Sequence, residues 1–140
     1  MIKPKVLFLC TANRCRTQMA EAFLLDLAGD RFDAVSAGYE QALELCPDAI
    51  DAMREVGIDI SGQSPKRAEQ FLGERFSCVV ALCDREIEST CPVFPGAIWR
   101  LTWPVENPAT AQNDTERRAA TRRARDEIQR YVVEFVKEHT

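Results

Sequence analysis

The chain has 140 residues, 46% of them hydrophobic, which suffices for one core, and we expect residues 1–140 to form a single domain. The net charge is −4 with both signs mixed throughout, which argues against nucleic acid as a main partner. No apolar run of about 18 residues is present, so we expect no membrane span or membrane partner. The first predicted strand leaves no room for a signal peptide, and we therefore expect a cytoplasmic protein.

Four apolar, β-rich runs are typical of strands buried on both faces. They cover residues 6–10, 34–37 with their flanks, 78–82 and, more weakly, 97–101. Helical patterns separate these strands and cover residues 17–28, 47–56, 68–72 and 114–139. The apolar stripe of the first helix consists of Met19, Ala20, Phe23, Leu24 and Leu27. Pro47 can open the second helix, and Asn113 or Asp114 can cap the last.

This order of elements, β-α-β-α-α-β-β-α, predicts a three-layer α/β/α fold with a four-stranded parallel sheet and right-handed crossovers. Ligands of such sheets bind outside the carboxyl ends of the strands. Cys10 and Cys83 both come at the end of a predicted strand, 73 positions apart. We therefore expect them at the same edge of the sheet.

The segment from Cys10 to Arg16, CTANRCR, joins the first predicted strand to the first helix. Backbone N–H groups at a helix N-terminus attract a tetrahedral anion, and a guanidinium binds two of its oxygens with a planar fork. The same positive field favours a reactive Cys10 thiolate. A core cysteine beside a surface arginine is the alternative, but strand, loop and helix all fall where the chemistry needs them. The oxyanion-binding positions are Thr11, Ala12, Asn13, Arg14, Cys15, Arg16 and Thr17.

Six cysteines are many for a chain of this length. An extracellular disulfide framework is one interpretation, but the absent signal peptide and the ample core argue against it. The chain has no C-x-x-C pair and its only histidine is His139, so we expect no metal site. Reactive thiols remain as the favoured explanation.

Cys83 follows the third predicted strand, and Cys91 comes eight residues later, after a polar segment. A loop of this length can bring two thiols within disulfide reach or hold them apart. Taken alone, the pair is explained equally well as a core thiol and a thiol before a proline turn. With Cys10 at the same sheet edge, a relay of three thiols is favoured. The thiols interpreted as structural are Cys15, Cys46 and Cys78.

These motifs resemble those of arsenate reductases built on the low-molecular-weight protein tyrosine phosphatase fold, over nearly the whole chain. The C-x5-R loop is shared by all phosphatases of that fold, whereas Cys83 and Cys91 with CPVFPG are more specific to the reductases. The matching segments are VLFLCTANRCRTQMAEAFL, SAG, AMREVGIDISG, VVALCDREIESTCPVFPG and TWPVENPA.

The resemblance implies that Cys10 attacks arsenate while Arg16 and the loop N–H groups hold its oxygens. Thr17 matches the family hydroxyl that hydrogen-bonds the Cys10 sulfur. Cys83 then attacks Cys10 and arsenite leaves. Cys91 attacks Cys83 next, which moves the disulfide to Cys83–Cys91 and frees Cys10.

The implied partners are arsenate, with phosphate or sulfate as analogues, and an external thiol reductant. That reductant is thioredoxin or a glutathione and glutaredoxin system. No bound cofactor is expected. One small domain with mixed surface charge is expected to be a monomer.

The chain departs from the resembled fold at Asn107-Pro108, where other members have Asp-Pro. That aspartate is the general acid of the phosphatases, and an amide cannot replace it in this role. The positions considered for the proton donor are therefore Asn107 and its neighbour Glu106. The departure weakens a phosphatase function more than a reductase function.

A second departure concerns potassium, which some members bind through positions matching Asn13, Glu21 and Ser36 together with an aspartate. The position of that aspartate aligns with Lys66. The Lys66 ammonium would replace the cation, so we expect no K⁺ dependence; a solvated loop lysine is the alternative. Asn13 is then expected to hold the loop through side-chain hydrogen bonds.

Two other functions stay open at this point. A low-molecular-weight phosphatase would hydrolyse phosphomonoesters through Cys10 and Arg16, with neither distal thiol. A non-enzymatic sensor would bind arsenite through Cys83 and Cys91, because soft thiolates suit such ions.

Overall fold

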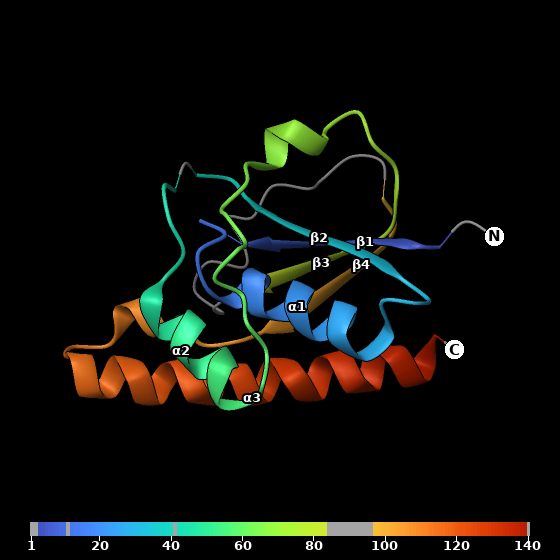
Figure 1. The fold of residues 1–140 in the computed structure, drawn as a ribbon. Coiled ribbons are helices and arrows are strands. Elements are labelled where there is room, and N and C mark those ends of the chain that lie inside the picture. Colours follow the sequence, from blue (N-terminus) through green and yellow to red (C-terminus); the bar gives the residue numbers. More distant parts are fainter. Residues whose placement is uncertain (1–2, 11, 41, 84–96, 140) are drawn as a thin grey trace.

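In the computed structural model, four parallel strands form one sheet in the order β2-β1-β3-β4 (Figure 1). The structure describes residues 3–10, 12–40, 42–83 and 97–139, without the side chain of Cys83. The strands are β1 (Lys5–Cys10), β2 (Asp33–Gly38), β3 (Phe76–Cys83) and β4 (Ala97–Pro104). The predicted four-stranded parallel sheet is confirmed.

The α-helices are α1 (Arg16–Ala28), α2 (Pro47–Glu55) and α3 (Asp114–Glu138). All three lie on one face of the sheet, whereas the 3₁₀ turn η1 (Ala68–Phe71) covers the other face (Figure 1). The third layer is therefore thinner than a layer of α-helices, as far as the described residues extend. A second 3₁₀ turn, η3 (Pro108–Thr110), lies between β4 and α3.

The apolar run of β1 forms the centre of both cores. Val6 and Phe8 belong to the core beneath the α-helices, whereas Leu7 and Leu9 belong to the core beneath η1, and each is at most 1% exposed. Burying a side chain of this size stabilises the fold by about 2 kcal/mol. Because both faces are covered, this strand shows a continuous apolar run rather than an alternating pattern.

One residue of the predicted α1 stripe lies outside the core. Leu27 is 46% exposed, because in the last turn of α1 it is Ala28 that faces the interior, with no exposure. The interior of α1 also includes polar residues at its N-terminal end, Thr17 and Gln18, which are fully buried. Their burial is explained by the loop they support.

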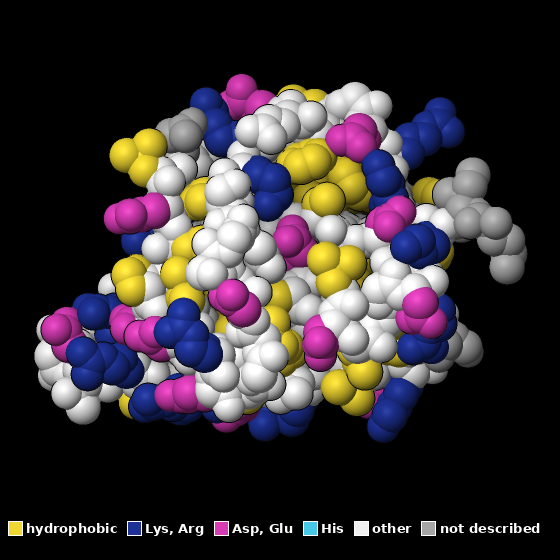
Figure 2. All heavy atoms as spheres, in the orientation of Figure 1, with side chains coloured by type: hydrophobic (Ala, Val, Ile, Leu, Met, Phe, Trp, Pro, Cys, Tyr) yellow, Lys and Arg dark blue, Asp and Glu magenta, His cyan; other side chains and the backbone are white. Residues whose placement is uncertain are grey.

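Helix α3 packs against α2. Asn113 caps α3, because its Oδ1 accepts a hydrogen bond from the Glu116 N–H at 2.9 Å. The Arg125 guanidinium on α3 donates to the Ala52 carbonyl at 3.0 Å and to the Glu55 carboxylate at 2.7 Å. Figure 2 shows basic and acidic side chains interleaved over α2 and α3 on this face.

None of the described helices is long and apolar enough to cross a membrane.

The carboxyl ends of β1, β2 and β3 and the N-termini of α1 and α2 lie at one edge of the sheet. Leu9 of β1 pairs with Ala81 of β3, so these neighbouring strands end together, at Cys10 and Cys83. Helices α1 and α2 begin at the same edge, because each follows a strand that ends there. This edge is the expected place for a ligand.

Candidate active site

Asn13 fixes the shape of the loop between β1 and α1. Its φ of 56° lies in the left-handed region, which asparagine tolerates better than most residues, and its side chain is fully buried. The Gln18 side-chain amide donates to the Asn13 carbonyl at 3.0 Å and to Asn13 Oδ1 at 2.9 Å. The Lys66 backbone N–H also donates to Asn13 Oδ1, at 2.8 Å. The Asn13 side chain thus links the loop to a segment more than fifty positions away.

Cys10 lies at the start of this loop and is only 4% exposed. The Asn13 backbone N–H donates to Cys10 Sγ at 3.1 Å, and the Thr17 hydroxyl lies 3.2 Å from it. Asn13 Nδ2 donates to Thr17 Oγ1 at 2.7 Å, which leaves the hydroxyl hydrogen to point at the sulfur. Asn13 and Thr17 therefore both present a hydrogen-bond donor to the Cys10 sulfur.

Arg16 starts α1 and is 4% exposed. Its Nη1 donates to the Val105 carbonyl at 3.1 Å, which orients the guanidinium from the far side of the site. No described carboxylate forms an ion pair with Arg16. Its charge is available to an oxyanion, together with the N-terminus of α1.

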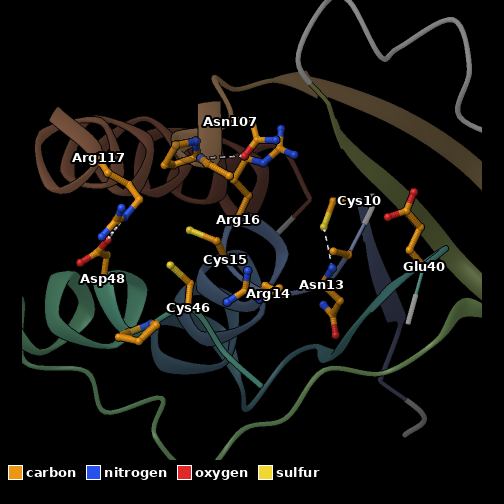
Figure 3. Close-up of a pocket in the computed structure, with 14 residues that line it drawn as sticks. Cys10, Asn13, Arg14, Cys15, Arg16, Glu40, Cys46, Asp48, Asn107 and Arg117 are labelled. Carbon is orange, nitrogen blue, oxygen red and sulfur yellow. Dashed lines mark hydrogen bonds and ion pairs between the residues drawn. The ribbon is translucent and has the colours of Figure 1, made fainter. Parts of the chain in front are cut away.

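A cavity of about 570 Å³ opens over this loop (Figure 3). Its walls come from the loop itself, from the start of α2, from residues 107–109 and from α3. The Arg117 guanidinium on α3 closes one wall by donating to Asp48 Oδ2 at 2.6 Å. Of the predicted oxyanion positions, those that line the cavity are Ala12, Asn13, Arg14, Cys15 and Arg16.

Seven lining residues were not predicted as site residues, namely Glu40, Cys46, Pro47, Asp48, Pro108, Ala109 and Arg117. A signal for the α2 contribution was present, because a helix that follows β2 must begin at the same sheet edge as the loop. Arg117 had no such signal, since only the packing of α3 against α2 brings it there.

Three predicted positions cannot be placed with their side chains. Cys83 ends β3 beside β1, but its side chain lies outside the described residues, as do Thr11 and Cys91.

Cys78, interpreted as structural, is 2% exposed in the core, where desolvation raises its thiol pKa to about 11. A thiol with so high a pKa is unreactive at neutral pH.

The two positions considered for the proton donor face different surroundings. Asn107 lines the cavity and caps η3, because its Oδ1 accepts from the Ala109 N–H at 3.1 Å. The Glu106 carboxylate instead accepts two hydrogen bonds from Arg123 on α3, at 2.8 and 3.3 Å. Glu106 is not among the residues that line the cavity.

Lys66 lies beside Glu21, one of the positions that the resemblance matches to a potassium site. Its Nζ is 3.7 Å from Glu21 Oε1, and the Ser36 hydroxyl donates to the same oxygen at 3.0 Å. Burial raises the pKa of Glu21, and the charge of Lys66 opposes this shift. Among the described residues, no group of three His, Cys, Asp or Glu side chains is placed to hold a metal ion.

Cys15 and Cys46 form a thiol pair at the cavity wall. A hydrogen bond from the Cys15 thiol lowers the pKa of Cys46 to about 6, and the same interaction raises the pKa of Cys15. Cys46 is partly exposed. The sequence alone did not indicate this pairing.

We expect Cys46 to react with iodoacetamide at a rate that is already near its plateau at neutral pH and falls below about pH 6, where the thiolate is protonated. In a Cys15→Ala variant the donor is gone, and the midpoint should move upward toward that of an ordinary thiol. Peptide mass spectrometry of alkylation rates from about pH 5 to about pH 9 measures both. An unchanged midpoint in the variant would refute the hydrogen bond.

Comparison with known proteins adds to this geometry. Residues 5–138 match the family model described as low molecular weight phosphotyrosine protein phosphatase. An arsenate reductase from Halalkalibacterium halodurans is 41% identical over 136 residues, covering 96% of each chain. A solved arsenate reductase in the phosphate binding state superimposes with a TM-score of 0.82 at 30% identity, covering 98% of this chain and 99% of the other.

A thioredoxin-dependent arsenate reductase from Corynebacterium glutamicum superimposes with a TM-score of 0.74 at 27% identity. The alignment covers 97% of this chain and 61% of that longer chain. The matched family model and the similar solved structures agree with the four-stranded parallel sheet. The chain therefore belongs to the low-molecular-weight phosphotyrosine protein phosphatase family and, within it, to the arsenate reductases.

Proposed function

We propose that this arsenate reductase converts arsenate to arsenite by covalent catalysis at Cys10, followed by a relay of disulfides through Cys83 and Cys91. The observation that supports it most is the environment of the Cys10 sulfur. It accepts hydrogen bonds from Asn13 and Thr17, and Cys10 is buried where the strand ends and the loop to Arg16 begins. A tetrahedral oxyanion at this position meets a nucleophile, a guanidinium and a helix N-terminus at once.

In the first step the Cys10 thiolate attacks arsenic, and an oxygen of arsenate leaves as hydroxide and takes up a proton. The Arg16 guanidinium and the loop N–H groups hold the remaining oxygens. Cys83 then attacks the Cys10 sulfur, the As–S electron pair stays with arsenic, and arsenite leaves in the trivalent state. Cys91 attacks Cys83, which forms the Cys83–Cys91 disulfide and releases the Cys10 thiolate.

The Cys83–Cys91 disulfide must then be reduced by two electrons from an external dithiol. The name of the Corynebacterium relative favours thioredoxin as that reductant. A glutathione and glutaredoxin system is the alternative. The protein itself needs no bound cofactor for any of these steps.

The test is arsenate-dependent oxidation of NADPH in two parallel assays. One contains thioredoxin and thioredoxin reductase, and the other contains glutathione, glutaredoxin and glutathione reductase. We expect turnover in the thioredoxin assay. Turnover in the other assay alone would exclude thioredoxin as reductant, and no turnover in either would refute the reductase cycle.

We also propose that Lys66 replaces the cation that some family members bind. Its ammonium lies at Glu21 beside Ser36, so a potassium ion there would meet like charge. Exchanging sodium for potassium at constant ionic strength should leave turnover unchanged. In a Lys66→Ala variant, potassium should become stimulatory, because Glu21 then lacks its positive partner. Stimulation of the wild type by potassium would contradict this role.

A further inference from the structure

Cys15 and Cys46 are the two thiols that line the cavity together with Cys10. Each occupies the N-cap position of a helix, Cys15 on α1 and Cys46 on α2. Figure 3 shows their sulfur atoms facing each other from the two helices, beside Arg14 and on the same side of the cavity. The proposed relay uses neither of them.

The backbone holds this pair together independently of the thiols. The Cys46 backbone N–H donates to the Arg14 carbonyl at 3.1 Å, which fixes residue 46 next to the peptide that leads into Cys15. The Arg14 Nε–H donates to the Glu44 carbonyl at 3.1 Å, which is a second link between the same two segments. Two separate hydrogen bonds therefore hold the segments that carry Cys15 and Cys46 side by side.

The pair also has the chemistry of a reactive dithiol. Both thiols are partly exposed, unlike the core thiol Cys78. The hydrogen bond from Cys15 lowers the pKa of Cys46 to about 6, so one member is a thiolate and the other carries a proton at neutral pH. Two adjacent soft sulfur ligands are suited to a soft, thiol-seeking centre such as trivalent arsenic.

We propose that Cys15 and Cys46 form a binding site for trivalent arsenic within the cavity in which Cys10 acts. The Cys46 thiolate displaces one hydroxide of arsenite and the Cys15 sulfur displaces a second. The Cys15 proton and one proton from solvent convert both hydroxides to water, and arsenic stays trivalent throughout. Two S–As bonds form, two As–O bonds break, and no electron is transferred.

This site rests on the proposed function only for the origin of its ligand, since the relay releases arsenite into the same cavity. Arsenic held by Cys15 and Cys46 would fill the space over the Cys10 loop. Arsenite would then act as a product inhibitor, and its inhibition would depend on a cysteine outside the relay.

Binding can be tested without turnover in a full-length chain that carries Cys10→Ser, Cys83→Ser and Cys91→Ser. Phenylarsine oxide, whose single arsenic binds two thiols, is added to the reduced protein, and the intact mass is measured. We expect about one adduct per chain, which a small dithiol removes and a monothiol does not. Adding Cys46→Ser should abolish the adduct, whereas adding Cys78→Ala, the matched control, should retain it.

Serine is a favoured N-cap residue, so Cys46→Ser should keep the start of α2 intact. No adduct on the parent protein, or an adduct that survives Cys46→Ser, would overturn the proposal. A Cys15–Cys46 disulfide that persists in reducing buffer would also overturn it, because the thiols would then not be available.

A second readout uses the relay enzyme with only Cys46→Ser added. The arsenite concentration for half-inhibition, relative to each variant's own uninhibited rate, should rise at least about tenfold, because chelation by two thiols is lost. An unchanged concentration would contradict product binding at this pair. If the wild type shows no turnover at all, the reductase cycle fails while the mass experiment still decides the arsenic site.

Discussion

A Cys91→Ser variant is expected to release about one arsenite per chain and then stop, even with excess thioredoxin system. Cys10 and Cys83 remain intact in this variant, so arsenate is attacked and arsenite leaves once. The Cys10–Cys83 disulfide then persists, because no third thiolate is present to move it. The loss is from continuous turnover to a single equivalent.

Quantifying arsenite against enzyme concentration measures this directly, and peptide mapping of the stopped enzyme should find Cys10 linked to Cys83. Cys78→Ala is the matched control, because it also removes one cysteine but from the core, and it should turn over continuously. Continuous turnover by Cys91→Ser would show that the external reductant attacks the first disulfide. The third thiol would then be dispensable.

An Asn107→Asp variant is expected to hydrolyse p-nitrophenyl phosphate about a hundredfold faster than the wild type, or more. Residue 107 lines the cavity over Cys10, and an aspartic acid there can protonate the leaving group. One carboxylate oxygen can keep the bond that Asn107 Oδ1 accepts from the Ala109 N–H, so the local fold should persist. An aspartic acid at position 107 would thus supply the proton donor that Asn107 cannot.

Asn107→Ser is the control for this gain, since serine keeps a capping oxygen but is no general acid. It should stay at the wild-type rate. The gain in Asn107→Asp should decline as pH rises through the pKa of the new carboxyl, because only its protonated form donates. Equal rates for the serine and aspartate variants would show that leaving-group protonation is not what limits hydrolysis.

The sheet and the Cys10 loop could be predicted because their signals are local. The run at residues 6–10 is apolar on every residue, and it is buried on both faces as such a run predicts. The loop needs only a strand end, a helix start and the residues between them. Asn113 was a candidate cap on residue type alone, and it caps α3.

Features that depend on contacts between distant segments were not predictable in the same way. Leu27 fits the apolar period of α1, yet it is exposed because the core does not extend to that side of the last turn. Glu106 is adjacent to Asn107, but Arg123 on α3 binds its carboxylate. No local pattern around Cys46 predicts its pairing with Cys15. The pairing arises because the Cys46 backbone N–H donates to the Arg14 carbonyl in the loop between β1 and α1.

Lys66 is an intermediate case. The family resemblance, rather than any pattern within the chain, predicted Lys66 near Glu21. Backbone hydrogen bonds fix Lys66 at this place, because its N–H donates to Asn13 Oδ1 and its carbonyl accepts from the Gly38 N–H. Lys66 thus contacts the loop between β1 and α1, the end of β2 and the buried Glu21 carboxylate.

The most direct test of the account is a single turnover of the reduced wild-type enzyme with arsenate and no external reductant. We predict about one arsenite per chain, with peptide mapping that finds a Cys83–Cys91 disulfide and a free Cys10 thiol. Absence of arsenite, or arsenite accompanied by a disulfide between any other pair of cysteines, would contradict the three-thiol relay.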